Sequence, residues 1–376
     1  MVKEFKKKRC LGCGKEDFLI SSFLGVCRDC IIENFENVKN IIYRAHQSSR
    51  EEFDLPPHFP RTKKAEAVVC NLCAIKCELS QGEKSFCGLR ENKNGKLKGA
   101  SMLEGYLAWY YDNLPTNCVA DWVCPGGTGE GYPHFSHTKG PEYGYKNLAV
   151  FYYGCSFNCL FCQNWHWREN IKKIKPISPA ELLEAIDTHT SCICFFGGDP
   201  SSQITHSLKV AELAREKFKG KILRICWETN GCMSERFLDR MAKISLESGG
   251  CIKFDLKAFN ENMNIALCGV SNRKTLENFR YLSSFFKKRK EPPLLVASTL
   301  LVPGYITEEE VAQIARFIAS LDPSIPYTLL AFHPHFYLHD LPTTSRNHAR
   351  NCFKIAKEAG LERVKIGNIH LLSDAY

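Results

Sequence analysis

The sequence predicts an α/β fold with a cysteine-rich N-terminal extension, and two features of the chain predict it. From residue 147 onward, short runs rich in β-branched and aromatic residues alternate with amphipathic segments of helical periodicity. Before that point, cysteines gather in spaced groups among charged, glycine-rich and proline-rich stretches. Strands that alternate with helices favour a parallel sheet covered by helices on its outer face.

Seven runs from residue 147 onward predict strands. Roughly six strand–helix units follow the first strand, so the pattern favours a partial (β/α)6 TIM-like barrel over a complete eightfold one. Sites in such barrels lie at the C-terminal ends of the strands. The expected strands are residues 147–153, 192–198, 221–228, 251–257, 294–302, 327–332 and 363–368.

The sequence predicts where two helices of this region begin. Ser178 is followed three residues later by Glu181, and Thr307 is followed likewise by Glu310. Each pair predicts a capping box, in which the two side chains satisfy backbone N–H groups of the first turn. Pro179 suits the first helical position.

The composition excludes several classes of protein. A hydrophobic content of 44% and a charged content of 24% are ordinary for a globular chain. No run of eighteen apolar residues predicts a membrane span, and the basic N-terminus lacks the apolar stretch of a secretory signal. We therefore expect a cytoplasmic protein without a membrane partner. The formal charge of +9 counts every cysteine as neutral, so it is a weak argument for nucleic acid.

Twenty cysteines in a long chain without an export signal indicate metal binding rather than disulfides. The first four, Cys10, Cys13, Cys27 and Cys30, form two CxxC pairs with thirteen residues between them, close to zinc-ribbon spacing. We favour a structural zinc ion, with an iron centre as the alternative. Four thiolates leave no open position, so the role would be folding or partner docking.

A second set of four follows a proline-rich, charged stretch: Cys70, Cys73, Cys77 and Cys87. Zinc and an auxiliary iron–sulfur cluster both suit four thiolates. We favour a structural metal, with an electron-relaying cluster as the alternative.

The other cysteines carry weaker signals. Cys118 and Cys124, with His134 and His137, lie in a Gly/Pro-rich loop, and their spacing is poor evidence for a metal. We expect this loop to cover or shape the active site. Free cysteines on predicted strands or helices are commonly small buried hydrophobes, so packing is expected for the rest. They are Cys192, Cys194, Cys226, Cys232, Cys251, Cys268 and Cys352.

The strongest motif is GCSFNCLFCQNW at residues 154–165, directly after a predicted strand. Cys155, Cys159 and Cys162 follow the pattern CxxxCxxC, and three thiolates can hold three corners of a 4Fe–4S cluster. The fourth iron is then free to bind the amino and carboxylate groups of a methionine moiety. The alternative is a zinc loop that lacks its fourth ligand.

This motif resembles that of the radical S-adenosylmethionine (SAM) superfamily, and its CQNW end resembles the pyruvate formate-lyase activating enzyme-like branch. The resemblance extends from Cys70 to Ile369, and the second cysteine set resembles the AmmeMemoRadiSam-type group. It implies an enzyme whose cluster receives one electron from a donor such as ferredoxin or flavodoxin. SAM is then cleaved to methionine and a 5′-deoxyadenosyl radical, which abstracts hydrogen from a substrate.

The resemblance also implies a SAM pocket. Residues 197–200 are similar to the family's GGEP segment, which meets the amino group of SAM, with Asp199 where the family usually has Glu. Residues two apart on a strand face one side, so two pairs on the third and fourth strands can line the pocket. For Asp255 and Lys257 a structural ion pair is the alternative. The implied SAM residues are Gly197, Gly198, Asp199, Pro200, Glu228, Asn230, Asp255, Lys257 and Pro303.

These features divide the chain into three expected regions. Residues 1–45 form a zinc-ribbon-like unit, 46–145 a linker with the second four-cysteine region and the Gly/Pro-rich loop, and 146–376 the barrel.

Three functions are compatible with this organisation. We favour a radical SAM enzyme acting on a small molecule or on another macromolecule. The alternative is a glycyl-radical-enzyme activating enzyme that acts on a protein glycine and docks its protein substrate through the N-terminal ribbon. A non-enzymatic, metal-stabilised binding module is the third, and the intact cluster loop argues against it.

Overall fold

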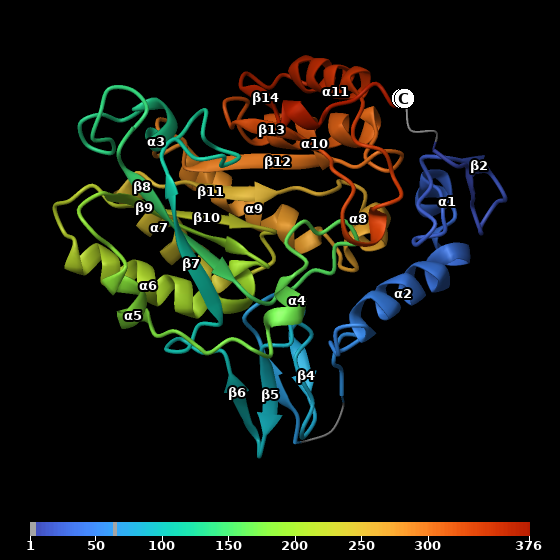
Figure 1. Cartoon of the computed structure of the whole chain (residues 1–376), viewed down its shortest axis with the longest axis horizontal. Coiled ribbons are helices and arrows are strands. Elements are labelled where there is room, and N and C mark those ends of the chain that lie inside the picture. The colour runs from blue at the N-terminus through green and yellow to red at the C-terminus, as the bar shows by residue number, and fades with distance from the viewer. Residues whose placement is uncertain (1–4, 63–65) are drawn as a thin grey trace.

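The computed structural model describes residues 5–62 and 66–376, and its centre is one eight-stranded sheet (Figure 1). The strands follow one another in chain order, and seven of them are parallel. All seven expected strands are confirmed, as is the partial barrel with its cysteine-rich extension. The strands are β7 (Leu107–Asn113), β8 (Lys146–Tyr152), β9 (Thr190–Gly197), β10 (Arg224–Thr229), β11 (Ile252–Asp255), β12 (Leu295–Leu301), β13 (Tyr327–Ala331) and β14 (Val364–Gly367).

Helices alternate with these strands along the chain, and α7, α9 and α11 pack against strands of the sheet. Side chains between the layers are fully buried, among them Ile225 and Trp227 of β10. No helix of the described ranges is long and apolar enough to span a membrane. The barrel helices are α5 (Pro179–Glu184), α6 (Ile204–Lys217), α7 (Leu238–Ser248), α8 (Glu261–Cys268), α9 (Arg273–Phe286), α10 (Glu308–Leu321) and α11 (Arg346–Glu358).

One of the two expected capping boxes is present. Ser178 accepts a hydrogen bond from the Glu181 backbone N–H, and the Glu181 side chain accepts from that of Ser178. The second prediction is wrong, because the Thr307 side chain makes no cap hydrogen bond. The buried Glu310 carboxylate instead accepts hydrogen bonds from the backbone N–H groups of Phe259 and Asn260, so a tertiary contact replaces the local one.

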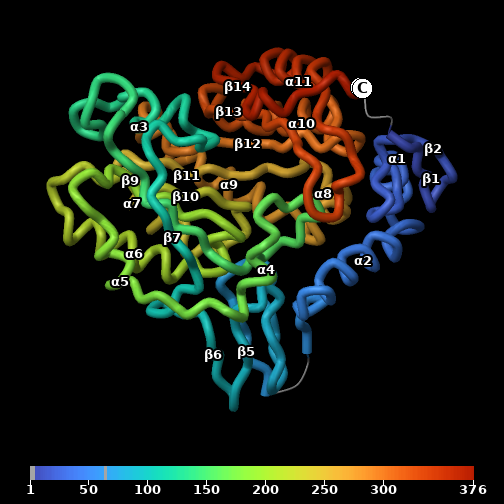
Figure 2. The backbone as a smooth tube through the Cα atoms, in the orientation of Figure 1, coloured from blue at the N-terminus to red at the C-terminus, as the bar shows by residue number. Residues whose placement is uncertain are grey.

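The N-terminal extension consists of a short hairpin, β1 (Lys8–Arg9) and β2 (Glu16–Asp17), followed by α1 (Arg28–Glu33) and α2 (Phe35–Glu51). In Figure 2 its trace runs along one side of the barrel, and both helices contact α8. The extension is also fixed to the turn after β12. There the Tyr305 hydroxyl accepts a hydrogen bond from the Ser21 N–H and donates one to the Val26 carbonyl.

The region between the extension and the barrel contains more strand than the sequence predicted. The strand β7 pairs antiparallel with β8 and forms one edge of the sheet. Its middle is largely exposed, so it lacks the alternation of apolar and polar residues that predicts a strand. Two small hairpins precede it: β3 (Val68–Cys70) with β4 (Cys77–Leu79), and β5 (Arg90–Lys93) with β6 (Lys96–Gly99).

The loop between β7 and β8 includes the short helix α3 (Pro125–Thr128) and is fixed to the barrel by a buried ion pair. Both nitrogen ends of the Arg224 guanidinium donate to the Glu142 carboxylate, at 2.9 and 2.6 Å, and neither side chain is more than 2% exposed. Burial opposes ionisation of Glu142. Hydrogen bonds and charge from Arg224 outweigh it and lower the pKa of Glu142 to about 2.

We expect Arg224→Ala to destabilise the protein by about 3–5 kcal/mol, because it leaves the Glu142 carboxylate buried without a partner. Urea unfolding at neutral pH measures this loss. The matched control is Arg240→Ala, which breaks a pair of the same 2.6 Å length between side chains about half exposed. That change should cost less than about 1 kcal/mol. Equal losses of unfolding free energy in the two variants would contradict the assignment of Arg224 and Glu142 as a stabilising buried pair.

The same pair predicts a pH dependence. Because the pKa of Glu142 is depressed on folding, its stabilising contribution is complete above the ordinary value of 4.5 and is lost as the pH falls toward about 2. Unfolding measured across this range should show that slope in the wild-type protein. The Glu142→Gln variant should show less of it.

Candidate active site

A cavity of about 180 Å³ lies at the C-terminal ends of the strands, beneath the loop that follows β8. It brings the three cysteines of the CxxxCxxC motif together with seven of the nine residues expected around SAM. Cys155 and Cys159 are buried and Cys162 is half-buried. The lining includes Cys155, Cys159, Cys162, Gly197, Gly198, Asp199, Glu228, Asn230, Asp255 and Lys257.

The two remaining residues expected around SAM, Pro200 and Pro303, do not line this cavity. Pro200 begins a short 3-10 helix after β9. Pro303 is buried in the turn after β12, next to the Tyr305 that holds the N-terminal extension. In that segment it is Leu300 that lines the cavity.

The glycines at the end of β9 permit a close approach between two backbones. The Gly198 N–H donates to the Tyr152 carbonyl at 2.8 Å, and the next N–H along the chain donates to the Gly154 carbonyl. A Cβ atom on Gly198 would lie 2.6 Å from that Gly154 oxygen, and Gly197 has a φ of +113°. The end of β9 therefore lies directly against the start of the cysteine loop.

Asp199, the residue that differs from the family's usual Glu, is used within the protein. Its buried carboxylate accepts hydrogen bonds from the backbone N–H groups of Ser201 and Asn230 and from the Thr229 hydroxyl. Burial raises its pKa to about 6, against these hydrogen bonds. The side chain braces the ends of β9 and β10 against each other.

Pairs of residues on neighbouring strands face the same cavity, as strand alternation predicts. Asn230 donates to the Ser156 hydroxyl at 3.0 Å, within the cysteine loop. The Lys257 ammonium group lies 2.9 Å from the Asp255 carboxylate, so these two form an ion pair at the rim of the cavity. Coulombic attraction links Lys257 to Cys159 as well.

The cysteine loop is held from behind by the N-terminal helix α2. Asn158, which is fully buried, donates its side-chain N–H groups to His46 and Ser49 of α2, at 3.0 and 2.8 Å. Its backbone N–H donates to the carbonyl of Cys268 at the end of α8. The loop therefore lies between α2 and α8.

Arg168 provides a test of whether an anionic group fits this site. The side chain is 2% exposed, and its Nε and Nη1 atoms have no hydrogen-bond partner in the described part of the chain. It lines the cavity, and its charge acts on Cys159 and Cys162. Unpaired buried guanidinium donors are costly, and thiolates with the sulfides of a cluster would satisfy them. The donor set fits a three-thiolate iron–sulfur cluster.

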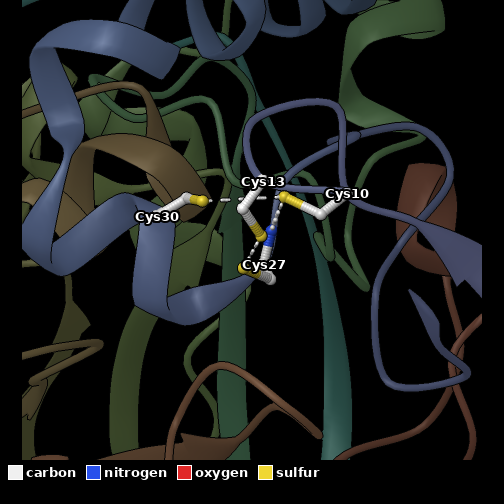
Figure 3. Close-up of side chains that lie close together, drawn as sticks. All are labelled: Cys10, Cys13, Cys27 and Cys30. Atoms are coloured by element: carbon white, nitrogen blue, oxygen red, sulfur yellow. Dashed lines mark hydrogen bonds between the residues drawn. The ribbon is translucent and has the colours of Figure 1, made fainter. Parts of the chain in front are cut away.

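The N-terminal cysteines converge on one point (Figure 3). Among residues 5–62 and 66–376 they are the one group of three or more Cys, His, Asp or Glu ligand atoms all within 4.8 Å of one another. The Sγ atoms of Cys10 and Cys30 are 3.8 Å apart, as are those of Cys13 and Cys27. Four sulfurs in a tetrahedron at zinc–sulfur distances of about 2.3 Å lie about 3.8 Å from each other.

Backbone groups favour the ionised form of one of these thiols. The N–H groups of Gly12 and Cys27 donate to the Cys10 sulfur at 3.4 and 3.2 Å. Burial opposes ionisation, but these backbone hydrogen bonds outweigh it and lower the pKa of Cys10 to about 6.

The second four-cysteine set is buried and lines a single small cavity, although its sulfurs are not gathered as tightly as the first set. Ser156 of the cluster loop lines the same cavity, so the two sites are neighbours. Arg90 lines it too, and its Nη2 atom has no partner among the described residues. These four cysteines are Cys70, Cys73, Cys77 and Cys87.

A larger cavity of about 390 Å³ occupies the barrel lumen and shares Asn164 and Glu228 with the cluster cavity. Its walls carry six cysteines that were expected to pack in the core or to lie in a weak loop group. Strand alternation indicates that three of them face the same side as site residues, because Cys194, Cys226 and Cys251 stand two or four residues before Gly198, Glu228 and Asp255. The six are Cys118, Cys124, Cys192, Cys194, Cys226 and Cys251.

The other unassigned cysteines and histidines lie elsewhere. Cys232, Cys268 and Cys352 are fully buried, which agrees with the packing role expected for them. His134 is exposed, and His137 stacks on Tyr145 with ring centroids 4.2 Å apart, so neither joins the lumen thiols.

A third cavity, of about 430 Å³, lies beside the ends of β13 and β14. It reaches Gln163 of the cluster loop and Glu228, so it also borders the cluster cavity. An ion pair between Lys365 and Asp121, 2.9 Å long, crosses it.

Comparison with known proteins finds similarity over the barrel region. The model of the radical SAM superfamily matches residues 149–318. The chain is 25% identical to an uncharacterized protein of Methanocaldococcus jannaschii over 312 residues, covering 80% of this chain and 81% of the relative. It is 25% identical to the pyruvate formate-lyase 1-activating enzyme of Escherichia coli over 225 residues, covering 58% and 86%.

A further relative is the isethionate sulfite-lyase activating enzyme of Oleidesulfovibrio alaskensis, 30% identical over 142 residues, covering 38% of this chain and 41% of the relative. The matched region contains the cysteine loop and the strand ends that form the cluster cavity. Residues 149–318 match the radical SAM superfamily, and the similar proteins support its pyruvate formate-lyase activating enzyme-like branch.

Proposed function

We propose that this radical SAM enzyme holds its 4Fe–4S cluster on Cys155, Cys159 and Cys162 and binds SAM in the same cavity. The observation that carries the proposal is the shared lining of that cavity. Three thiols of the motif face a glycine-rich strand end and an ion pair, with the unpartnered Arg168 donors beside them. When bound, the cluster and SAM supply reductive cleavage and a 5′-deoxyadenosyl radical that abstracts hydrogen.

In this proposal the chain's own residues bind and orient SAM. The backbone at Gly197 and Gly198 offers a surface without side chains, against which the amino acid part of SAM can lie. Asn230 and the Asp255–Lys257 pair supply polar groups on the opposite side of the cavity. Arg168 offsets the negative charge of the thiolates. Electrons come from an external reductant, for which ferredoxin or flavodoxin would be suitable donors.

For the substrate we favour a small molecule or a segment of another macromolecule that enters through the third cavity. That cavity is of ligand size, is polar at Asp121 and Lys365, and ends at Gln163 beside the cluster loop. A substrate there would reach the edge of the SAM site without crossing the protein.

The alternative is activation of a glycyl-radical enzyme, and the names of two relatives favour it. In that case the substrate is a glycine in a protein, and the exposed N-terminal unit is available for docking. Electron paramagnetic resonance distinguishes the two. Reaction with a glycyl-radical protein should give a persistent glycyl signal if the alternative holds, whereas a small-molecule enzyme should give none.

We also propose a metal at each four-cysteine set outside the barrel. The 3.8 Å sulfur spacing supports zinc at Cys10, Cys13, Cys27 and Cys30. At the wider second set, the Arg90 Nη2 atom has no partner among the described residues, which supports a metal centre of either kind, zinc or an iron–sulfur cluster.

The first test is anaerobic. We expect the reconstituted protein with dithionite and SAM to yield 5′-deoxyadenosine, detected by mass spectrometry. Replacing any one of Cys155, Cys159 or Cys162 with Ala should abolish the product, because each thiolate holds one corner of the cluster. The control is Cys352→Ala, a buried cysteine of α11 that lines none of the three cavities. Full product formation by a loop variant would contradict the assignment.

The second test concerns the N-terminal set. We expect Cys10→Ser or Cys27→Ser to remove about one zinc per chain, because a four-thiolate zinc site does not survive the loss of a ligand. Metal analysis after anaerobic purification measures zinc and iron together. Thermal unfolding should occur at lower temperature, while the cluster's visible absorbance should remain. Unchanged zinc, with iron lost instead, would identify this set as an iron centre.

A further inference from the structure

The lumen thiols form an ordered group on three neighbouring strands. In the pairing of β9 with β10, Cys194 lies opposite Cys226. Cys251, just before β11, lies beside Cys226, and its backbone N–H is 3.4 Å from the Cys226 sulfur. Since strand residues at the same level point the same way, these three side chains form a row across the lumen wall.

A fourth thiol reaches this row from the loop between β7 and β8. The ammonium group of Lys253 donates to the sulfurs of Cys118 and Cys194, at 3.0 and 3.1 Å. One buried cation therefore bridges the loop thiol and the strand thiols. The loop is held in this position by the Arg224–Glu142 pair at the base of β10.

A buried lysine lies where the thiols gather. Lys253 is 1% exposed, and its carboxylate neighbour is Glu228 at 3.3 Å. Lys253 is in contact with two neutral thiols as well, which are weak partners for a buried ammonium group. Thiolates or cluster sulfides would accept stronger hydrogen bonds from this ammonium group than neutral thiols do.

The spacing of the sulfurs argues against a single zinc ion. In the part of the chain that the structure describes, no three lumen thiols have all their sulfurs within 4.8 Å, whereas zinc thiolates lie about 3.8 Å apart. The cavity of about 390 Å³ leaves room for a larger inorganic group between them. Cys₄ ligation is the usual arrangement for both 2Fe–2S and 4Fe–4S clusters.

We propose that Cys118, Cys194, Cys226 and Cys251 bind a second iron–sulfur cluster inside the barrel lumen, with Lys253 donating to its sulfurs. This site is separate from the cluster on the loop after β8, and it does not depend on the substrate of the enzyme. Cys192 lies opposite Arg224 in the pairing of β9 with β10, and Cys124 also lines the cavity; neither is a ligand in this proposal.

The test removes the loop cluster first. In a Cys155→Ala, Cys159→Ala, Cys162→Ala background, iron and acid-labile sulfide are measured after anaerobic reconstitution, and the reduced protein is examined by electron paramagnetic resonance. Adding Cys194→Ser, Cys226→Ser and Cys251→Ser should lower iron by about two to four atoms per chain and remove one cluster signal. If the background variant and the variant that also lacks the lumen cysteines contain equal amounts of iron, the proposal is overturned.

A matched control removes buried thiols outside the lumen. Cys268→Ser with Cys352→Ser in the same background should leave iron and the signal unchanged, because neither residue lines the cavity. Equal iron loss in this control would also overturn the proposal. If the triple lumen variant does not fold, as judged by circular dichroism and zinc content, the single variant Cys226→Ser is measured in its place. It should keep the fold and change the lumen cluster's signal, and an unchanged signal would refute the site.

Discussion

The contact between the end of β9 and the start of the cysteine loop determines the geometry of the whole site. The Gly198 and Asp199 N–H groups bond to the carbonyls of Tyr152 and Gly154, and Asn164 of the loop donates back to the Gly197 carbonyl. No side chain fits between these backbones. The loop therefore keeps a fixed distance from the strand ends, and the thiols share a cavity with the polar residues of β10 and β11.

Buried positive charge is the second organising constraint. Within residues 5–62 and 66–376, Arg168 and Arg90 have donors without partners beside the two adjoining cysteine sets, and Lys253 lies among the lumen thiols. Burying a cation costs desolvation free energy. A thiolate beside the cation offsets this cost, whereas a neutral thiol does not. Burial raises the pKa of most of these thiols, and the neighbouring cations act in the opposite direction.

Much of this was predictable from the sequence, and the failures have physical causes. The strands of the barrel are buried runs between helices, and such runs carry a strong local signal, as in residues 192–198. The cluster motif is local too. The second capping box failed because Glu310 is used by a loop distant in sequence. The lumen thiols were missed because Cys194, Cys226 and Cys251 meet only through strand register, which spacing along the chain does not encode. The use of Asp199 as a brace depends on the position of β10 for the same reason.

The path from the N-terminal unit to the cluster loop is short and continuous. The Cys10–Cys30 site precedes α2, and α2 carries the His46 and Ser49 that hold Asn158 behind the thiols. An oxidant that attacks the exposed Cys13 would therefore act at the start of the segment whose far end supports the cysteine loop.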